Sequence, residues 1–431
     1  MKKLCSLIGT SKYKGCIYRL GDYRSSATSY VQMALLELLP KVGHPIEELV
    51  VFATEEARAA HEASLRNEIL QKGAAVSLRF VPIVDKVTEC TIWEFFRQVY
   101  DTIDEKDTIY FDITHGFRSL PLAVLSILHY ARELKSIEIG KVLYGNFEAR
   151  TMAIDCNTYV AQIDDLTDLV SFLDWTYGVK TFLSTGDAKM LIQLTEEQGL
   201  ASQPYADTDV DSFRSRQVAE RMQNLTQAMA TCRGTTFAYH ALRLRSTIEE
   251  AMDDPVAYSQ PLVNLFHKVA EKMEPFTGDK VMDPSYAVTW CIEHGMIQQA
   301  YTLLEEHVTT AFCLMLGVDD NKRKTREVVS SGLNVGMQRK PESEWIYQSL
   351  ADKKLMERVV ELLKEFEAFK GSFSLLKKYR NNINHAEKNA GMIKIGKIYS
   401  TIVELTRALE PFFLQVQLVL HSREQTAASK D

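Results

Sequence analysis

The stretch TIYFDITHGFRSLPLAVLSILHYAREL, residues 108–134, decides how the fold is interpreted. Its first seven residues are mostly strand formers, and from Leu120 onward apolar residues recur at the spacing of a helix. Between these two parts, Asp112, Thr114, His115 and Arg118 crowd into one short turn. The stretch therefore predicts a buried strand, a polar turn and a helix.

The same alternation of short apolar strands and amphipathic helices surrounds this turn. We predict strands at 4–11, 49–54, 76–84 and 108–114, helices at 28–39, 55–73, 91–103 and after Pro121, and a closing hairpin made by 140–147 and 149–156. Such alternation predicts a mostly parallel, Rossmann-like α/β sheet covered on both faces. Neither GxGxxG nor GxxxxGK[ST] occurs, so the sequence gives no reason to propose NAD or a P-loop nucleotide.

Beyond about residue 160 the strand signals fade and the pattern becomes helical. We predict helices at 164–183, 211–232, 237–254, 286–317, 351–371, 373–389 and 395–420, with a polar loop before 351 and a frayed tail from 422. The turn-rich segment EPFTGDKVMDPS (274–285) is typical of a boundary. We therefore expect an α/β domain at 1–160, an all-α connecting region at 161–280 and an all-α domain at 281–425.

Composition restricts the class of protein. Of 431 residues, 46% are hydrophobic and 25% are charged, as in globular domains, and the net charge of -7 disfavours coating nucleic acid through bulk charge. The seven cysteines are scattered without a CxxC pair, which disfavours a disulfide framework or a zinc site. Without a signal peptide or a membrane-length apolar run, we expect a cytoplasmic protein with no membrane contact.

The polar turn has the features of an anion site. In open parallel sheets, ligands bind at the carboxyl ends of strands, where helix N-termini present free N–H groups. Ser119 is placed to cap the next helix, Gly116 allows close approach of the backbone, and Arg118 adds a cation. The segments GTSKYKG (9–15) and ATEE (53–56) end other strands with polar residues. We predict a phosphate-bearing ligand, although a capped turn without any ligand fits the spacing as well.

This turn also resembles a known family. Asp112, Thr114, His115 and Gly116, with LIGTS near residue 10 and VLYGNFEA (142–149), resemble the D-x-T-H-G branch of the CARF domains of type III CRISPR ancillary effectors. The resemblance implies a cyclic oligoadenylate activator, with cyclic tetra-adenylate the first choice and cyclic hexa-adenylate the second. It also implies a homodimer or higher homo-oligomer with the ring on its two-fold axis. The candidate ligand-binding residues are Thr10, Ser11, Lys12, Thr54, Asp112, Thr114, His115, Gly116, Arg118 and Ser119.

A second motif lies in the last helical region. KKYRNNINHAEKN (377–389) contains Arg380, Asn381 and His385 in an R-x4-H pattern. On an ideal helix Asn381 and His385 share a face, whereas Arg380 points away and needs a long reach or a bend. Arginine suits a scissile phosphate and histidine suits proton transfer near neutral pH. By themselves, these residues are equally consistent with an ordinary helix surface.

The motif and QAYTLLEEH (299–307) resemble the HEPN ribonucleases. That resemblance implies a metal-independent endoribonuclease with Arg380, Asn381 and His385 as catalytic residues, RNA products with 2′,3′-cyclic phosphates, and no cofactor. Single-stranded RNA is then the substrate, and no stable association with the type III complex is required. Other histidines, among them His61 and His240, carry no motif.

Two alternatives stay open at this point. The chain could be a ligand-gated transcription regulator whose middle helices bind DNA, although the acidic net charge and the R-x4-H motif count against it. It could instead be a ring nuclease, in which the first domain degrades the cyclic oligoadenylate.

Overall fold

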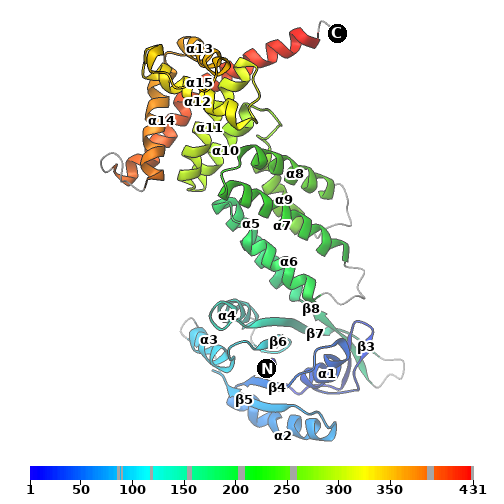
Figure 1. Ribbon diagram of the computed structural model, residues 1–431. Coiled ribbons are helices and arrows are strands. Elements are labelled where there is room, and N and C mark those ends of the chain that lie inside the picture. Colours follow the sequence, from blue (N-terminus) through cyan, green and yellow to red (C-terminus); the bar gives the residue numbers. More distant parts are fainter. Residues whose placement is uncertain are drawn as a thin grey trace. The chain divides into compact units, whose positions relative to one another are not determined.

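The computed structural model describes residues 1–84, 88, 91–116, 120–152, 158–201, 209–252, 260–385 and 393–428. The chain divides into two compact units, Met1–Leu173 and Asp174–Asp431, and each is described by itself. The first unit is an α/β domain and the second is helical (Figure 1). The predicted fold classes of these two parts are confirmed.

A single sheet organises the first unit. Its strand order is β3-β2-β8-β7-β6-β1-β4-β5. The strands are β1 (Lys2–Ile8), β2 (Cys16–Leu20), β3 (Tyr23–Arg24), β4 (Glu48–Ala53), β5 (Ser77–Pro82), β6 (Thr108–Asp112), β7 (Glu138–Met152) and β8 (Tyr159–Asp165). β1 pairs in parallel with both β4 and β6, and the parallel pairing continues to β5 and β7. The chain thus adds β4 and β5 on one side of β1. It then crosses to the other side of β1 and adds β6 and β7 there.

Helices cover both faces of this sheet. α1 (Val31–Leu38) and α2 (Glu55–Gln71) pack on one face, with the short η1 (Pro40–Val42) between them in sequence, and α3 (Thr91–Thr102) and α4 (Leu120–Lys135) pack on the other (Figure 1). Because strand side chains alternate between faces, the middle strands supply two separate apolar cores. Cys5 and Leu7 belong to one core, and Leu4 and Ile8 to the other.

The predicted closing hairpin is wrong in position. The segment 140–152 is one strand, β7, and its antiparallel partner is β8. β8 and the short strands β2 and β3 were not predicted. Each of them is short or lies among polar residues, so none shows the continuous apolar run that marks the central strands.

Eleven α-helices of the described residues follow the sheet. They are α5 (Thr167–Thr185), α6 (Lys189–Ala201), α7 (Asp209–Ala230), α8 (Gly234–Met252), α9 (Gln260–Met273), α10 (Met282–Glu293), α11 (Ile297–Leu316), α12 (Arg323–Met337), α13 (Leu350–Lys364), α14 (Phe369–Asn384) and α15 (Ile395–Ala428), with the 3-10 helix η2 (Glu342–Glu344) before α13. One apolar cluster extends through the second unit, from Trp175 to Val416. Phe237 and Trp290, whose rings lie 5.7 Å apart, connect the helices before and after 274–285.

Three helical predictions need correction. The segment predicted as a polar loop contains α12, whose buried Val329 and Leu333 are one turn apart. The helix predicted over 286–317 is broken into α10 and α11 at Gly295, which has a φ of 71°. The tail predicted to fray from 422 continues α15 to Ala428.

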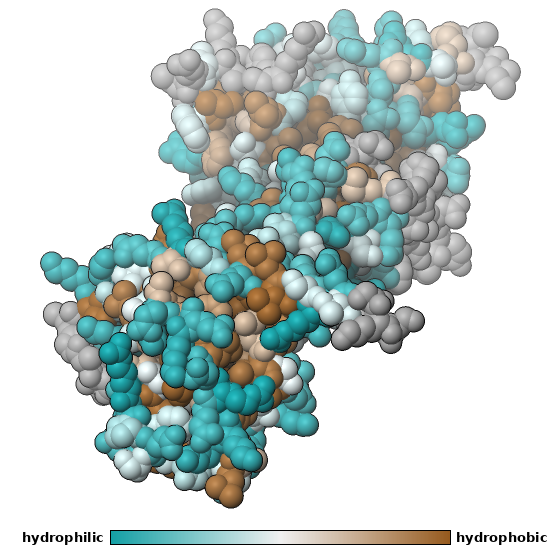
Figure 2. Space-filling view, turned by 90° about the horizontal axis from the view of Figure 1, so that it is seen from above, coloured by the Kyte–Doolittle hydropathy of each residue, from teal (hydrophilic) through white to brown (hydrophobic). Residues whose placement is uncertain are grey.

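Among the described helices, none is long and apolar enough to cross a membrane. The face shown in Figure 2 mixes hydrophilic and apolar side chains.

Candidate functional site

The loops that carry the candidate ligand residues meet at one edge of the sheet. β6, β1 and β4 are neighbours, so the loops after them leave the sheet side by side. The order in which the strands join the parallel sheet reverses between the neighbours β1 and β6. This is the topological switch point of the sheet. Open α/β sheets bind ligands at such a switch point. The structure therefore brings segments 9–15, 54 and 113–116 together.

Asp112 is the anchor of this edge. It is fully buried, and its Oδ2 accepts a hydrogen bond from Ser6 Oγ at 2.6 Å. Its Oδ1 accepts from the Thr114 N–H at 3.0 Å and also from the Thr114 hydroxyl. Gln32 Nε2 in turn donates to Ser6 Oγ at 2.8 Å. Burial raises the pKa of the Asp112 carboxyl, while these donors favour its ionised form.

Thr114 connects the loop to the neighbouring strand. The Gly145 N–H of β7 donates to Thr114 Oγ1 at 2.7 Å. The single hydroxyl proton of Thr114 is used on Asp112, so the side chain has only acceptor capacity left for a ligand. Gly116 has a φ of 110°, and a Cβ there would lie 3.2 Å from Leu7 Cδ1. A side chain at this position would therefore crowd Leu7 and strain the backbone.

An aromatic stack joins the loop after β6 to the loop after β1. The Tyr13 ring lies 4.4 Å from the His115 ring and 4.9 Å from the His61 ring, between centroids. The Tyr13 hydroxyl accepts from the Gly9 N–H at 2.8 Å and donates to the Gly9 carbonyl. Burial lowers the pKa of both His115 and His61, so both rings are neutral near pH 7.

The remaining predicted residues of the first unit differ in exposure. Thr10, Ser11 and Lys12 are exposed. Lys12 and Tyr13 line a groove of about 830 Å³ with His61 and residues of α2. Thr54 caps α2, because its hydroxyl accepts from the Ala57 N–H at 3.2 Å. Arg118 and Ser119 lie outside the described residues, and with them the predicted cap of α4.

The R-x4-H motif lies at the end of α14. His385 is the C-cap residue, directly after Asn384, and its N–H donates to the Asn381 carbonyl at 3.0 Å. Asn381 and His385 are both exposed. The Arg380 side chain, 31% exposed, meets Glu305 of α11, with Nε 3.4 Å from Oε2. Its Nη1 donates to Asn381 Oδ1 at 3.4 Å, and within the described residues it forms no hydrogen bond with His385.

A buried acid and a second cation accompany Arg380. Glu305 is only 14% exposed, and burial raises its pKa even though Arg380 and Lys377 oppose the rise. Burial likewise lowers the pKa of Lys377, whose ammonium donates to Asn334 of α12. Two cations thus share one face of α14, three residues apart, around a carboxyl.

The segment QAYTLLEEH divides between surface and core. His307 is buried, its ring stacks on Phe413 at 3.8 Å, and burial lowers its pKa to about 3. It is therefore a core residue. Glu306 is exposed and pairs with Arg326 at 2.5 Å.

The structure adds residues that the sequence did not indicate. Ser6 supports Asp112 from β1, and His61 stacks on Tyr13 from α2. A signal for His61 existed, since Ala57, His61, Leu65 and Ile69 recur every four residues and all face the core. Ser6 is a polar residue among the apolar residues of β1. A polar residue at such a position indicates a polar partner on a neighbouring strand.

Comparisons with known proteins cover most of the first unit and the first part of the second. Residues 3–153 match a family model described as the CARF domain of the CRISPR system endoribonuclease Csx1. Residues 171–276 match the second domain of the CRISPR-associated protein MJ1674. The curated protein of that name from Methanocaldococcus jannaschii is 21% identical over 242 residues, which are 55% of this chain and 34% of that protein. The chain thus spans about a third of the length of this relative.

Proposed function

We propose, from the premise that the chain is a CRISPR-associated protein with a CARF domain in its first unit, that it is a ribonuclease switched on by cyclic oligoadenylate. The activator binds at the carboxyl edge of β1 and β6, on the two-fold axis of a homodimer. Cyclic tetra-adenylate is the first choice of ring. The R-x4-H motif of α14 cuts single-stranded RNA without a metal ion, as part of type III CRISPR defence.

The observation that supports this proposal best is the position of the D-x-T-H-G loop. It lies beside the topological switch point between β1 and β6, inside the segment that matches a CARF domain. Asp112 and Thr114 fix the backbone of the loop, and Gly116 leaves it open to close approach. Exposed Lys12 provides a cation for a ring of phosphodiesters. The neutral ring of His115, which packs against Tyr13, provides a flat surface for a base.

The chemistry assigned to α14 needs only groups that RNA and the chain supply. The RNA 2′-hydroxyl loses its proton and attacks the adjacent phosphorus, forming the P–O2′ bond. The P–O5′ bond breaks, and the leaving oxygen takes up a proton, which yields a 2′,3′-cyclic phosphate and a 5′-hydroxyl. His385 serves proton transfer, Arg380 stabilises charge on the phosphate, and Asn381 orients the site.

One chain presents this site in an incomplete form. His385 lies exposed at a helix end, and Arg380 is turned to Glu305. Two copies of α14 meeting at a two-fold axis would place two of each residue in one cleft. A ligand activates only by favouring the competent arrangement. The activator can therefore control cleavage by favouring the arrangement in which the two copies of α14 meet.

A cleavage assay with a panel of cyclic oligoadenylates tests the proposal. We expect labelled single-stranded RNA to be cut only with one ring size, equally well in EDTA, with cyclic-phosphate ends. The absence of cleavage with every ring would contradict the proposal. Chromatography of the labelled ring after incubation would reveal a ring nuclease, and a gel shift on duplex DNA would reveal a transcription regulator.

A further inference from the structure

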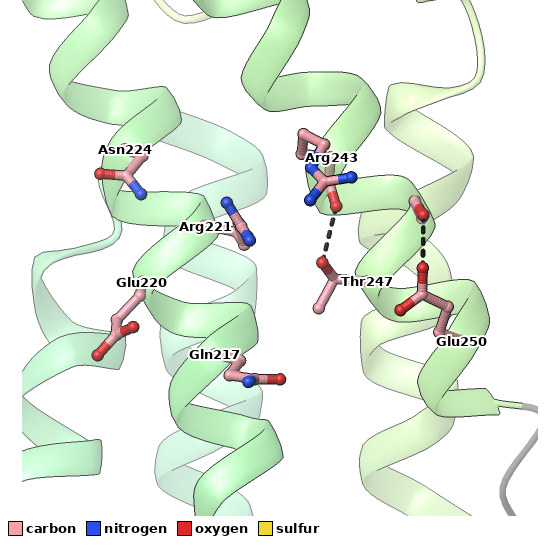
Figure 3. A pocket seen from close by; sticks show the side chains of 8 residues that line it. Gln217, Glu220, Arg221, Asn224, Arg243, Thr247 and Glu250 are labelled. Atoms are coloured by element: carbon pink, nitrogen blue, oxygen red, sulfur yellow. Dashed lines mark hydrogen bonds between the residues drawn. The ribbon is translucent and has the colours of Figure 1, made fainter.

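A polar groove lies between α7 and α8, in the part of the second unit that matches the MJ1674 second domain. It has a volume of about 360 Å³, which is within the range of small-ligand pockets. Gln217 and Arg221 project from α7 toward α8, and Arg243 and Thr247 line the opposite wall (Figure 3). This groove is separate from the loop after β6 and from the end of α14.

Two guanidinium groups face this groove without an ion-pair partner among the described residues. Within the described residues, neither Arg221 nor Arg243 forms an ion pair or a side-chain hydrogen bond. Arginines near each other on facing helices repel, and that cost is normally offset by an acid or a bound anion. Arg221 is half-buried, so water screens it less than it would a freely exposed charge.

The two acids that line the groove, Glu220 and Glu250, make their contacts with residues of their own helices. Glu220 pairs with Arg216 on α7, with Oε1 2.9 Å from Nε, and its carboxylate points away from α8 (Figure 3). Glu250 accepts a hydrogen bond from the Ser246 hydroxyl at 2.9 Å, one turn away on the same helix. Within the described residues neither carboxylate forms an ion pair with Arg221 or Arg243, so both guanidinium groups keep their donors for a ligand, and the amide of Gln217 adds further donors and an acceptor.

The face of α8 beside Arg243 adds a histidine and an aromatic ring. His240 is one turn before Arg243, and its buried Nδ1 has no hydrogen-bond partner in the described part of the chain. Burial lowers the pKa of His240, and the Arg221 charge lowers it further, so Arg221 lies near this ring. Tyr239 is 55% exposed and four residues before Arg243, which puts both on one face of the helix.

We infer that the groove between α7 and α8 binds the phosphodiester backbone of the single-stranded RNA substrate, outside the cleavage site. Arg221 and Arg243 contact phosphate oxygens, and Tyr239 offers a stacking surface for a base. Grooves that combine cations with an exposed aromatic ring are the usual design for single strands. The amide of Gln217 adds hydrogen bonds to phosphate or sugar, whereas the Thr247 hydroxyl donates to the Arg243 carbonyl and can only accept from a sugar hydroxyl. Only the identity of the strand as RNA rests on the proposed function.

The test measures binding of a short fluorescent 2′-O-methyl RNA to the full chain by anisotropy, across a series of salt concentrations. This strand lacks the 2′-hydroxyl that cleavage requires, and no activator is added. The variant is Arg221→Ala with Arg243→Ala. Its matched control is Lys268→Ala with Lys272→Ala, which removes two exposed cations from α9 of the same unit. A Lys/Lys variant at 221 and 243 tests whether charge alone suffices.

We expect the Arg double variant to bind at least about tenfold more weakly, since each charge-assisted contact with phosphate is strong. Its salt dependence should be shallower by about two in log–log slope, and the Lys/Lys variant should recover part of the affinity. The control should bind like the parent chain. Inorganic phosphate should compete only weakly, as expected for a site that takes several contacts from one strand.

Three results would overturn the inference. They are unchanged binding in the Arg double variant, an equal loss in the control, and tighter binding of duplex DNA than of single strands. The outcome is independent of catalysis. A chain that binds the strand through these arginines but cuts no RNA would refute the proposed function and leave the groove assigned. If the chain cuts RNA but the Arg double variant binds the strand like the parent chain, the groove assignment is refuted and the proposed function stands.

Discussion

The loop after β6 and the end of α14 each carry a short polar motif, but the chain holds them differently. Asp112 is fully buried, and the donors of Ser6 and Thr114 fix it from β1 and from the loop itself. His385 is exposed at the end of a helix, and its described hydrogen bond is made by the backbone. The first motif is complete within one chain, whereas the second presents its groups outward.

This difference indicates different roles. A preformed loop can bind a ligand without rearranging, and the cost of ordering it has been met on folding. Under the proposed function, the motif of α14, whose arginine faces an acid of its own chain, needs a second copy of α14 to become active. The proposed function thus assigns sensing to the loop after β6 and control to the end of α14. The predictions below test this division, from the largest expected effect to the smallest.

The largest effect should come from His385→Ala. Loss of a positioned proton-transfer group lowers rates by about 10²–10⁴. We expect RNA cleavage at saturating activator to fall by that factor, while activator affinity and the free energy of unfolding stay the same, because the side chain is exposed. Single-turnover cleavage of labelled RNA measures the rate.

Lys378→Ala is the matched control for this variant, since it removes an exposed cation from the same helix. It should retain the parent rate to within a few-fold. Full activity of His385→Ala would show that the exposed motif is only a helix end, and the contrast between the two regions would then lose its functional meaning.

The second effect concerns stability of the first unit. Asp112→Ala leaves the hydroxyls of Ser6 and Thr114 and the Thr114 N–H without their acceptor. Each buried donor left without a partner costs about 1–3 kcal/mol, so we expect a loss of several kcal/mol in urea unfolding of the first unit. Asp112→Asn keeps one acceptor oxygen and should lose less. An Asp112→Ala chain as stable as the parent would mean that the loop is not held by its aspartate.

Much of the first unit was predictable because its signals are local. The central strands β1, β4 and β6 contain continuous apolar runs, α2 begins with two acids, and a proline lies in the first turn of α4. β2 and β8 were missed because half of their residues face polar surroundings, which makes them look like loop segments. α12 was missed because basic residues at its start hide an apolar stripe.

The candidate site was predictable only in part. The D-x-T-H-G residues follow a strand, so their place at the sheet edge follows from sequence. The bond between Ser6 and Asp112 depends on which strands are neighbours, and the stack of His61 on Tyr13 depends on how α2 packs. These are properties of tertiary structure. The pairing of Arg380 with Glu305 is another, since 75 residues separate the two in sequence.

The third effect is a shift in the activating concentration. His115→Ala removes a ring from the stack with Tyr13 but no hydrogen bond of the Asp112 network. Base stacking on an aromatic side chain is worth about 1–3 kcal/mol, so the activator midpoint should rise by about tenfold or more while maximal cleavage is retained. Titration of cleavage against cyclic tetra-adenylate measures the midpoint. Thr114→Ala should shift it as well but should also lower stability, because Thr114 connects Asp112 to Gly145. An unchanged midpoint in both variants would remove the loop from the ligand site.

The smallest effect should come from Glu305→Gln. Burial raises the pKa of Glu305, so the folded chain keeps this proton to a higher pH than the unfolded chain does. Stability should therefore fall as pH rises from the ordinary range of glutamate, near 4.3, through the raised pKa, and this fall should be missing in the Gln variant. A partly exposed pair with Arg380 is worth about 0–1 kcal/mol, which limits the difference. Urea unfolding of both chains at several pH values measures it, with Glu306→Gln as the exposed control. A parent chain that gains stability relative to Glu305→Gln as pH rises would show that Arg380 outweighs burial. The motif of α14 would then be held as firmly as the loop after β6.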